Sequence, residues 1–289
     1  MISSITLPAP PKINLFLHIT GRRDDGYHNL QTLFQLLDGG DNLTFTLTEN
    51  NKISLSTQIE GVAESDNLIV RAASLLQKKS NCTRGCIIDL DKKLPMGAGL
   101  GGGSSNAATT LLALNKLWNC DLSIDELAKI GTKLGADVPV FVEGNSAFAE
   151  GIGEQLTPVD IPKSWYLIIT PDCTVSTEKI FSNPQLTRNS TPIKIRALSE
   201  EQYRNDCQAI VEKLHPQVKE VVEWLETYST PLMTGTGASV FCRWATEAQA
   251  KEVLSRVPQH WKAFVAQGVN HSPVHQKLKE FFIGASPSG

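Results

Sequence analysis

Short apolar stretches with alternating and β-branched residues recur along the first half of the chain, separated by turn residues. Such stretches are typical of β-strands, and they predict strands at residues 13–21, 30–38, 41–49, 52–59 and 85–91. Apolar residues spaced three and four apart predict helices at residues 65–80, 105–118 and 123–135. Ser65 or Asp66 could cap the first helix, and Ser123 with Glu126 forms a capping box for the third.

The second half has a different order of elements, which begins after a joint near residues 158–164. We predict strands at 165–170, 231–234, 238–244 and 261–267, and helices at 199–214, 216–228 and 246–257. Apart from one extra helix, this is the β-α-β-β-α-β order of a ferredoxin-like unit. Residues 284–289 are small and polar, and we expect them to be disordered.

The composition is that of a globular protein without surplus positive charge. Of 289 residues, 41 % are apolar and 20 % are charged, and the net charge is −3. Proteins that bind nucleic acid or anionic membranes usually carry excess basic residues, so neither partner is expected. There is no signal-peptide pattern, no long apolar run and no CxxC pair among the six cysteines. We therefore expect a cytoplasmic protein with reduced thiols.

The segment LPMGAGLGGGSSNAA, residues 94–108, has five glycines within seven positions, directly before a predicted helix. Glycine allows positive φ and has no Cβ to block a ligand. Successive backbone N–H groups and a helix N-terminus bind anions. Ser104 and Ser105 lie where the helix starts, so they could cap it, touch phosphate or approach a phosphate-bound Mg²⁺. The segment predicts a polyphosphate-binding loop.

Three other interpretations of this loop fit less well. Gly97, Gly99 and Gly102 match the GxGxxG pattern of dinucleotide-binding proteins, which needs a following strand and an acidic residue about 20 positions on. Residues 119–129 instead predict a loop and a helix. A P-loop needs lysine where Gly103 stands. A flexible hinge would account for the glycines alone, but not for two serines at a helix start.

The loop residues 95–108 resemble the phosphate-binding motif of the GHMP kinases, named for galactokinase, homoserine kinase, mevalonate kinase and phosphomevalonate kinase. Residues 10–28 (PPKINLFLHITGRRDDGYH) and 233–242 (MTGTGASVFC) resemble the first and third motifs of that superfamily. Residues 12–35, with GADVPVF and AFAEGIGE, are most similar to its members that phosphorylate 4-diphosphocytidyl-2-C-methyl-D-erythritol in the non-mevalonate isoprenoid pathway.

The resemblance runs from about Pro8 to Leu278 and implies an α+β, two-domain GHMP kinase fold. It places a ribosomal-S5-like, ATP-binding domain at residues 1–160 and a ferredoxin-like domain at residues 161–289, with the active site in the cleft between them. The implied activity is transfer of phosphate from ATP, with Mg²⁺, to the 2-hydroxyl of the cytidyl substrate.

Asp137 and Lys12 are the candidate catalytic residues. Asp137 lies between a helix end and an apolar, strand-like stretch, so it is either a partly desolvated base or a capping aspartate. Lys12 begins an apolar strand and is either functional or an edge lysine. The resemblance implies that Asp137 accepts the hydroxyl proton, and that Lys12 orients the hydroxyl or keeps Asp137 charged and assists the γ-phosphate.

The expected substrate contacts also follow from the resemblance. Taken by itself, the segment GRRDDGYHNL predicts only a turn with a charged surface. Tyr27 and His28 match a pair that holds cytidine, and Phe181 matches a ring that stacks on cytosine from the other side. Thr177 matches a hydroxyl near the substrate, and Ile152 could offer backbone groups to cytosine.

Asn14 lies two residues after Lys12, so it shares a strand face with it and could bond to the alcohol or phosphate. For adenine, the resemblance implies Asn67 and Leu68, although Asn67 could equally cap a helix. The implied phosphate contacts are the whole loop: Pro95, Met96, Gly97, Ala98, Gly99, Leu100, Gly101, Gly102, Gly103, Ser104 and Ser105. Metal ligands beyond Ser104 are unassigned.

Other possibilities stay open. The chain could be a different GHMP kinase, or a non-catalytic, RNA-binding S5-like module with an exposed basic face. His271 and His275 have the i, i+4 spacing of zinc sites, but Pro273 lies between them and no HExxH glutamate is present, so no metal is expected there. The expected partners are small molecules, and the expected state is a monomer or weak homodimer.

Overall fold

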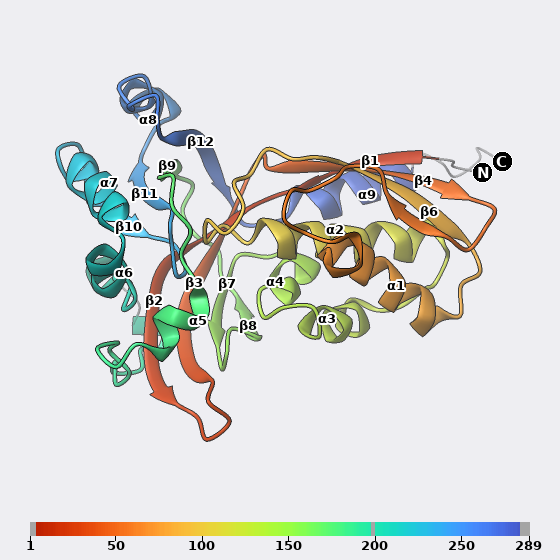
Figure 1. The fold of residues 1–289 in the computed structure, drawn as a ribbon, viewed down its shortest axis with the longest axis horizontal. Helices are drawn as coiled ribbons and strands as arrows, with labels where there is room; N and C mark the ends of the chain where they lie inside the picture. Colours follow the sequence, from red (N-terminus) through yellow and green to blue (C-terminus); the bar gives the residue numbers. More distant parts are fainter. Residues whose placement is uncertain (1–3, 198–199, 284–289) are drawn as a thin grey trace.

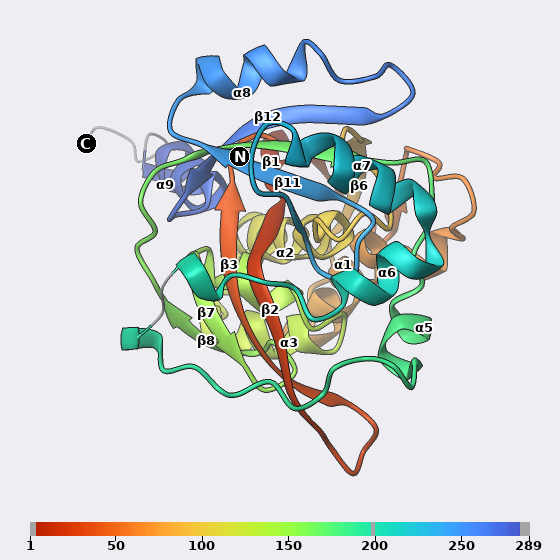
Figure 2. The ribbon, with the colours of Figure 1, turned by 90° about the vertical axis from the view of Figure 1, so that its left-hand side faces the viewer.

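A computed structural model describes residues 4–197 and 200–283. The long strands β2 (Lys12–Arg22) and β3 (His28–Leu37) run through the middle of the molecule. Helices α1 to α4 and α9 lie on one side of them, and α6 to α8 lie on the other (Figure 1). The turn between β2 and β3 projects beyond the body of the protein in both ribbon views (Figures 1 and 2). The residues predicted to form the disordered tail, 284–289, lie outside the described part.

A four-stranded sheet forms the outer layer of the first half. Its order is β1 (Ser4–Ala9), β4 (Asp41–Thr48), β6 (Gly85–Asp91) and β5 (Ile53–Leu55). Helices α1 (Leu68–Ser80) and α2 (Gly102–Leu117) bury their apolar sides against this sheet in one hydrophobic core. Strands β4 and β6 match the prediction, whereas β5 is shorter than residues 52–59 and β1 was not predicted.

The second sheet passes through both halves of the molecule. Its order is β10 (Leu232–Met233), β11 (Val240–Trp244), β9 (Trp165–Thr170), β12 (Lys262–Val269), β3, β7 (Ala147–Glu150) and β8 (Gln155–Pro158), and β2 pairs with β3. Strand β12 makes the connection, because it pairs with β9 over Lys262–Gln267 and with β3 at Gly268 and Val269. Its neighbours therefore come from opposite halves of the chain.

The ferredoxin-like prediction is confirmed. The strand order β12–β9–β11–β10 is antiparallel throughout, with α6 (Gln208–Leu214), α7 (Pro216–Glu226) and α8 (Glu247–Leu254) in the connections. The helix predicted at 199–214 is shorter and starts at Gln208. The residues before it instead pair with β2, since Leu17 N–H donates to Arg204 O and Asp206 N–H donates to Leu17 O.

Three helix predictions in the first half need correction. Asn67 caps α1 in place of Ser65 or Asp66, because residues 64–66 form a separate 3₁₀ turn. Helix α2 begins at Gly102, inside the glycine segment. The apolar stretch after Asp137 is a helix, α4 (Val138–Glu143), and not strand-like. The third predicted helix, α3 (Ile124–Thr132), has its capping box.

The last described helix, α9 (Pro273–Ile283), was not predicted, and it returns to the first half. Its buried residues Val274 and Leu278 belong to the same core as α1 and α2. The fold of the first half therefore includes residues from the end of the chain. Among the described residues, no helix is both long and apolar enough to cross a membrane.

Replacement of Leu278 by alanine tests this contribution of α9. The change removes a side chain that is 8 % exposed from the core of the first half. We expect it to lower the free energy of unfolding by about 2–5 kcal/mol, measured by urea denaturation. The exposed neighbour Lys277→Ala is the control and should change stability by less than about 0.5 kcal/mol. Equal stability of the two variants would mean that α9 does not stabilise this core.

Candidate active site

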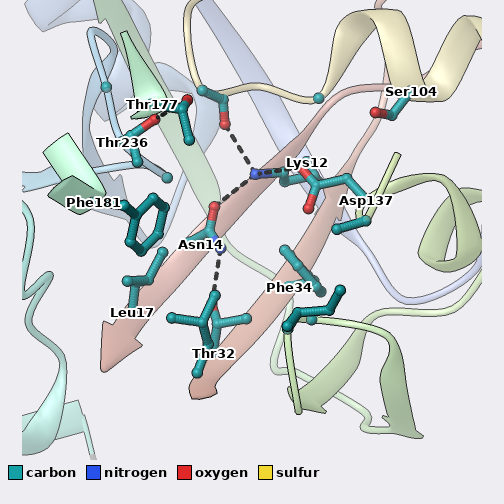
Figure 3. Close-up of a pocket in the computed structure, with 18 of the residues that line it drawn as sticks. Lys12, Asn14, Leu17, Thr32, Phe34, Ser104, Asp137, Thr177, Phe181 and Thr236 are labelled. Carbon is teal, nitrogen blue, oxygen red and sulfur yellow. Dashed lines mark hydrogen bonds and ion pairs between the residues drawn. The ribbon is translucent and has the colours of Figure 1, made fainter. Parts of the chain in front are cut away.

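The ammonium group of Lys12 is buried at the start of β2 and is surrounded by acceptors (Figure 3). Its side chain is only 3 % exposed, and Nζ lies 3.3 Å from Oδ2 of Asp137. Nζ also donates to Asn14 Oδ1 at 2.7 Å and to Gly99 O at 3.0 Å. These contacts match the three N–H groups of an ammonium, so the charge is paired and hydrogen-bonded despite its burial.

Asp137 precedes α4, and its side chain makes no capping bond to that helix. Its side chain is 35 % exposed, so the carboxylate borders both the buried lysine and open space. The pocket that Asp137 lines has a volume of about 360 Å³ and also contains Lys12, Gly97, Gly101 and Ser104. A substrate hydroxyl in this pocket could therefore reach the carboxylate.

Asn14 fixes the position of Lys12. The two residues share a face of β2, as predicted, and Asn14 Nδ2 donates to Thr32 Oγ1 at 2.8 Å. Thr234, on the glycine-rich turn of the second half, accepts from Asn14 N–H and donates to Asn14 Oδ1. Because both ends of its amide are already bonded, the observed role of Asn14 is to orient Lys12.

The glycine loop presents alternate residues to the pocket. Gly97, Gly99 and Gly101 have positive φ angles of 62°, 76° and 70°. Together with Ser104 they line the pocket, whereas Ala98 and Leu100 are buried. Gly102 and Gly103 already belong to the first turn of α2. Ser105 is fully buried, and its hydroxyl has no hydrogen-bond partner among the described residues.

Two of these glycines are required by packing within the protein. This corrects the expectation that every glycine of the loop serves to leave room for a ligand. A Cβ on Gly99 would lie 2.3 Å from Thr234 O, and one on Gly101 would lie 2.9 Å from the ring of Phe141. A Cβ on Gly97 would meet only Thr174, at 3.8 Å. Gly97 is therefore the glycine of this loop that best fits a close ligand approach.

Asp41, which was not predicted as a site residue, holds the segment before the glycine loop. Its fully buried carboxylate accepts from the backbone N–H groups of Lys93 and Leu94, both at 2.8 Å. It also accepts from Lys92 Nζ at 2.8 Å and from Asn106 Nδ2, in the first turns of α2, at 3.1 Å. Its only signal in the sequence was an aspartate at the start of a predicted strand.

A second pocket, of about 700 Å³, contains the residues predicted to bind the base. Tyr27, His28 and Phe181 line it, and it shares Ile152 and Thr177 with the first pocket. The rings of His28 and Phe181 are stacked, with centroids 5.2 Å apart, whereas Tyr27 is 61 % exposed. One face of Phe181 is therefore already covered by His28.

The polar groups of this pocket have partners that limit their roles. Thr177 Oγ1 lies 2.8 Å from Thr236 Oγ1, which links α5 (Thr177–Ser182) to the glycine-rich turn. Ile152 N–H donates to Glu154 Oε2 at 2.6 Å, which leaves only its carbonyl for a ligand. Burial, and then the charges of Arg188 and Arg22, lower the pKa of His28.

The residues predicted near adenine line neither of these two pockets. Asn67 caps α1 by accepting from Ile69 N–H at 2.9 Å, and it also lines a pocket of about 350 Å³. A Cβ on Gly103 would lie 3.5 Å from Leu68 Cδ1, so Leu68 packs against the start of α2. Pro95 and Met96 line a further pocket, which shares residues 57–59 with that of Asn67.

The described residues contain no cluster of three or more His, Cys, Asp or Glu side chains that could hold a metal by itself. His271 Nδ1 lies 2.9 Å from Asn145 Oδ1, and His275 Nε2 lies 2.9 Å from Val142 O, so both rings have structural partners. Burial lowers the pKa of His275. Ser104 and Asp137 are oxygen-bearing side chains that line the first pocket.

Comparison with known proteins identifies the family. Residues 67–145 match the GHMP kinase N-terminal domain, and residues 185–263 match the GHMP kinase C-terminal domain. The chain is 54 % identical over 285 residues to the 4-diphosphocytidyl-2-C-methyl-D-erythritol kinase of Marinobacter nauticus, covering 97 % of this chain and 99 % of that protein. The chain belongs to the 4-diphosphocytidyl-2-C-methyl-D-erythritol kinase family of GHMP kinases.

Other relatives agree with this assignment. The kinase of the same name from Shewanella piezotolerans is 54 % identical over 278 residues, covering 96 % of this chain and 98 % of that protein. A crystal structure of 4-(cytidine 5'-diphospho)-2C-methyl-D-erythritol kinase has a TM-score of 0.78 and 31 % identity, covering 92 % of this chain and all of that one. The predicted two-domain GHMP kinase fold is thus confirmed.

Replacement of Gly99 by alanine tests the contact between the glycine loop and the second half. The new Cβ would meet Thr234 O at 2.3 Å, and alanine is strained at a φ of 76°. We expect a loss of stability of about 1–3 kcal/mol or more, visible as a lower melting temperature. Gly103→Ala is the matched control, because its Cβ would meet only Leu68 at 3.5 Å. An unchanged melting temperature for Gly99→Ala would contradict the close approach.

Proposed function

We propose that this chain transfers the γ-phosphoryl group of ATP to the 2-hydroxyl of 4-diphosphocytidyl-2-C-methyl-D-erythritol. The observation that carries the proposal is the Lys12–Asp137 pair. It lies in the pocket of the glycine loop, and that pocket shares residues with the aromatic pocket around Phe181. One continuous space thus has a phosphate-binding side, a charged pair and a base-binding side.

Asp137 is the proposed acceptor of the hydroxyl proton. Phosphoryl transfer depends on alignment and charge stabilisation, and a carboxylate beside the hydroxyl gives the proton a destination. Lys12 keeps Asp137 ionised and offers positive charge to the transferred group. Because all three Nζ donors are engaged, contact with phosphate requires one bond to be exchanged. The bond to Gly99 O on the loop is the nearest to the phosphate path.

The triphosphate is proposed to lie along Gly97, Gly101 and Ser104, where α2 directs its unpaired N–H groups and the positive end of its dipole. Adenine would then lie toward Asn67, Leu68, Pro95 and Met96. Mg²⁺ usually takes one or two carboxylates together with substrate phosphates, which fits Ser104 and Asp137 as protein donors. When bound, the ion would neutralise phosphate charge.

The cytidyl end is proposed to occupy the second pocket. Tyr27 and Phe181 would contact the faces of the base, and His28, Thr177 and the Ile152 carbonyl would bond to polar atoms. Domains at residues 1–160 and 161–289, a monomeric or weakly dimeric state and a cytoplasmic location also remain proposals. Light scattering at increasing protein concentration tests the oligomeric state.

A coupled assay of ADP release tests the activity directly. The purified protein should release ADP from ATP only when the cytidyl substrate and Mg²⁺ are both present. Mevalonate and homoserine are the comparison substrates, and faster turnover with either of them would contradict the proposal.

Asp137→Asn tests the base. The change keeps the shape of the side chain but removes its charge, and we expect kcat to fall by about 10²–10⁴ with little change in either KM. Lys12→Met should behave similarly, and the double variant should lose less than the product, since the pair acts as a unit. Glu223→Gln removes an exposed ion pair on α7 and is the control. Near-normal kcat for Asp137→Asn would exclude a base role.

Phe181→Ala tests the base pocket. Stacking of a base on an aromatic ring is worth about 1–3 kcal/mol, so KM for the cytidyl substrate should rise roughly 5- to 150-fold while KM for ATP stays nearly constant. Tyr27→Ala, at an exposed position, should raise the same KM without loss of stability. Equal increases in both KM values would mean that Phe181 supports the fold instead.

A further inference from the structure

Arg188 lies in the loop between α5 and the segment that pairs with β2, and its guanidinium joins both sides of the second pocket. Nη2 donates to Phe181 O at 2.9 Å and to Asn183 O at 2.7 Å, and Nη1 donates to Leu186 O at 3.2 Å. Nε donates to His28 Nε2 at 3.0 Å. One side chain therefore connects the ring of His28 with the backbone of Phe181, the residue whose ring stacks on it.

The bond between Arg188 and His28 fixes where the imidazole carries its proton. A guanidinium is always protonated and can only donate, so His28 Nε2 must accept with a free lone pair. The proton of the neutral ring then lies on Nδ1. Within the described residues, no other group is hydrogen-bonded to the His28 ring, and His28 lines the pocket. An N–H donor is thus left for a molecule that enters it.

Burial and the charges around His28 favour the neutral ring. Burial is the largest cause of its lowered pKa, and the charges of Arg188, from the loop, and Arg22, from the end of β2, lower the pKa further. The other titratable groups that line the pocket are Asp25 and Tyr27 in the β2–β3 turn and Glu178 on α5. With two arginines acting on it, the ring is a neutral donor near pH 7 and does not compete as a cation for the substrate diphosphate.

We infer that Arg188 is a positioning residue for substrate specificity: it holds His28 as the Nδ1–H tautomer, so that a fixed neutral donor meets a hydrogen-bond acceptor on the pyrimidine edge. This inference rests on the proposed function, because it takes the cytidyl end of the substrate to occupy this pocket. It goes further by assigning a role to Arg188 and a definite hydrogen-bonding state to His28.

The tautomer can be measured without substrate. In protein labelled with ¹⁵N-histidine, long-range ¹H–¹⁵N spectra distinguish a protonated from an unprotonated ring nitrogen, and loss of one signal set in His28→Gln assigns His28 among six histidines. We expect Nδ1–H in the wild type and a shift toward Nε2–H in Arg188→Met. Arg188→Lys retains one donor and should partly restore the wild-type spectrum. A wild-type ring with Nε2–H overturns the inference.

Kinetics test the consequence. Arg188→Met should raise KM for the cytidyl substrate about 3- to 10-fold, the value of one ordinary hydrogen bond, with KM for ATP and kcat nearly unchanged. Arg204→Met is the matched control, because Arg204 bonds to Asp206 and Ser190 further along the same segment and has no bond to His28. An unchanged KM despite a changed tautomer, or an equal effect in Arg204→Met, contradicts the inference. Failure of the proposed function would instead appear as no ADP release by the wild type, with the spectra unaffected.

Discussion

The buried ammonium of Lys12 is the constraint on which the site depends. A charge this deeply buried is tolerated only when every donor has an acceptor. The three acceptors come from β2 itself, from the glycine loop and from the residue that precedes α4. Strand β2, the loop and the α3–α4 connection must therefore converge at one point, and the pocket lies where they meet.

The convergence extends to the second half of the chain through hydrogen bonds between side chains and backbone groups. Thr234 bonds to Asn14 and Gly99, so the glycine-rich turn of the second half touches both the strand that carries Lys12 and the phosphate loop. Asn205 adds a further restraint, since its amide donates to Met233 O and Gly235 O, both at 2.7 Å. Strand β12 also pairs with a strand of each half. Residues from both halves of the chain therefore hold the site in place.

Much of this arrangement could be predicted from local patterns. Alternation identified β2, β3, β4, β6 and β9, and the order of elements in the second half identified the ferredoxin-like unit. The chemistry of the site came from motifs, because nothing in the periodicity distinguishes Lys12 from an edge lysine or Asp137 from a cap. The predictions that were wrong concern elements that depend on tertiary contacts. Helix α9 packs into a core formed by residues distant in the sequence, and residues 204–206 extend along β2 instead of forming a helix turn.

Asp41 and Arg188 were missed for the same physical reason. Asp41 accepts from the backbone of Lys93 and Leu94, and Arg188 bonds to the ring of His28, so both have partners that are distant in the sequence. Such partners leave no spacing rule. The glycines show the converse case. Their pattern was recognised, but two of them are required by contacts with Thr234 and Phe141, which are distant in the sequence, and not by the ligand.

The close approach of Gly99 to Thr234 O bears on how such enzymes can diverge. The two residues belong to different family domains, yet the space between them admits no Cβ unless the backbone shifts. The backbones of the two halves therefore fit each other directly at this point. Substitution of side chains cannot compensate for a change in backbone position there. A natural or engineered hybrid that joins the halves of two relatives keeps a functional phosphate-binding loop only if both parents have the same backbone conformation at this contact. Recombination at the predicted joint near residue 160 is thus restricted by a contact between Gly99 and Thr234, both of which lie far from it in the sequence.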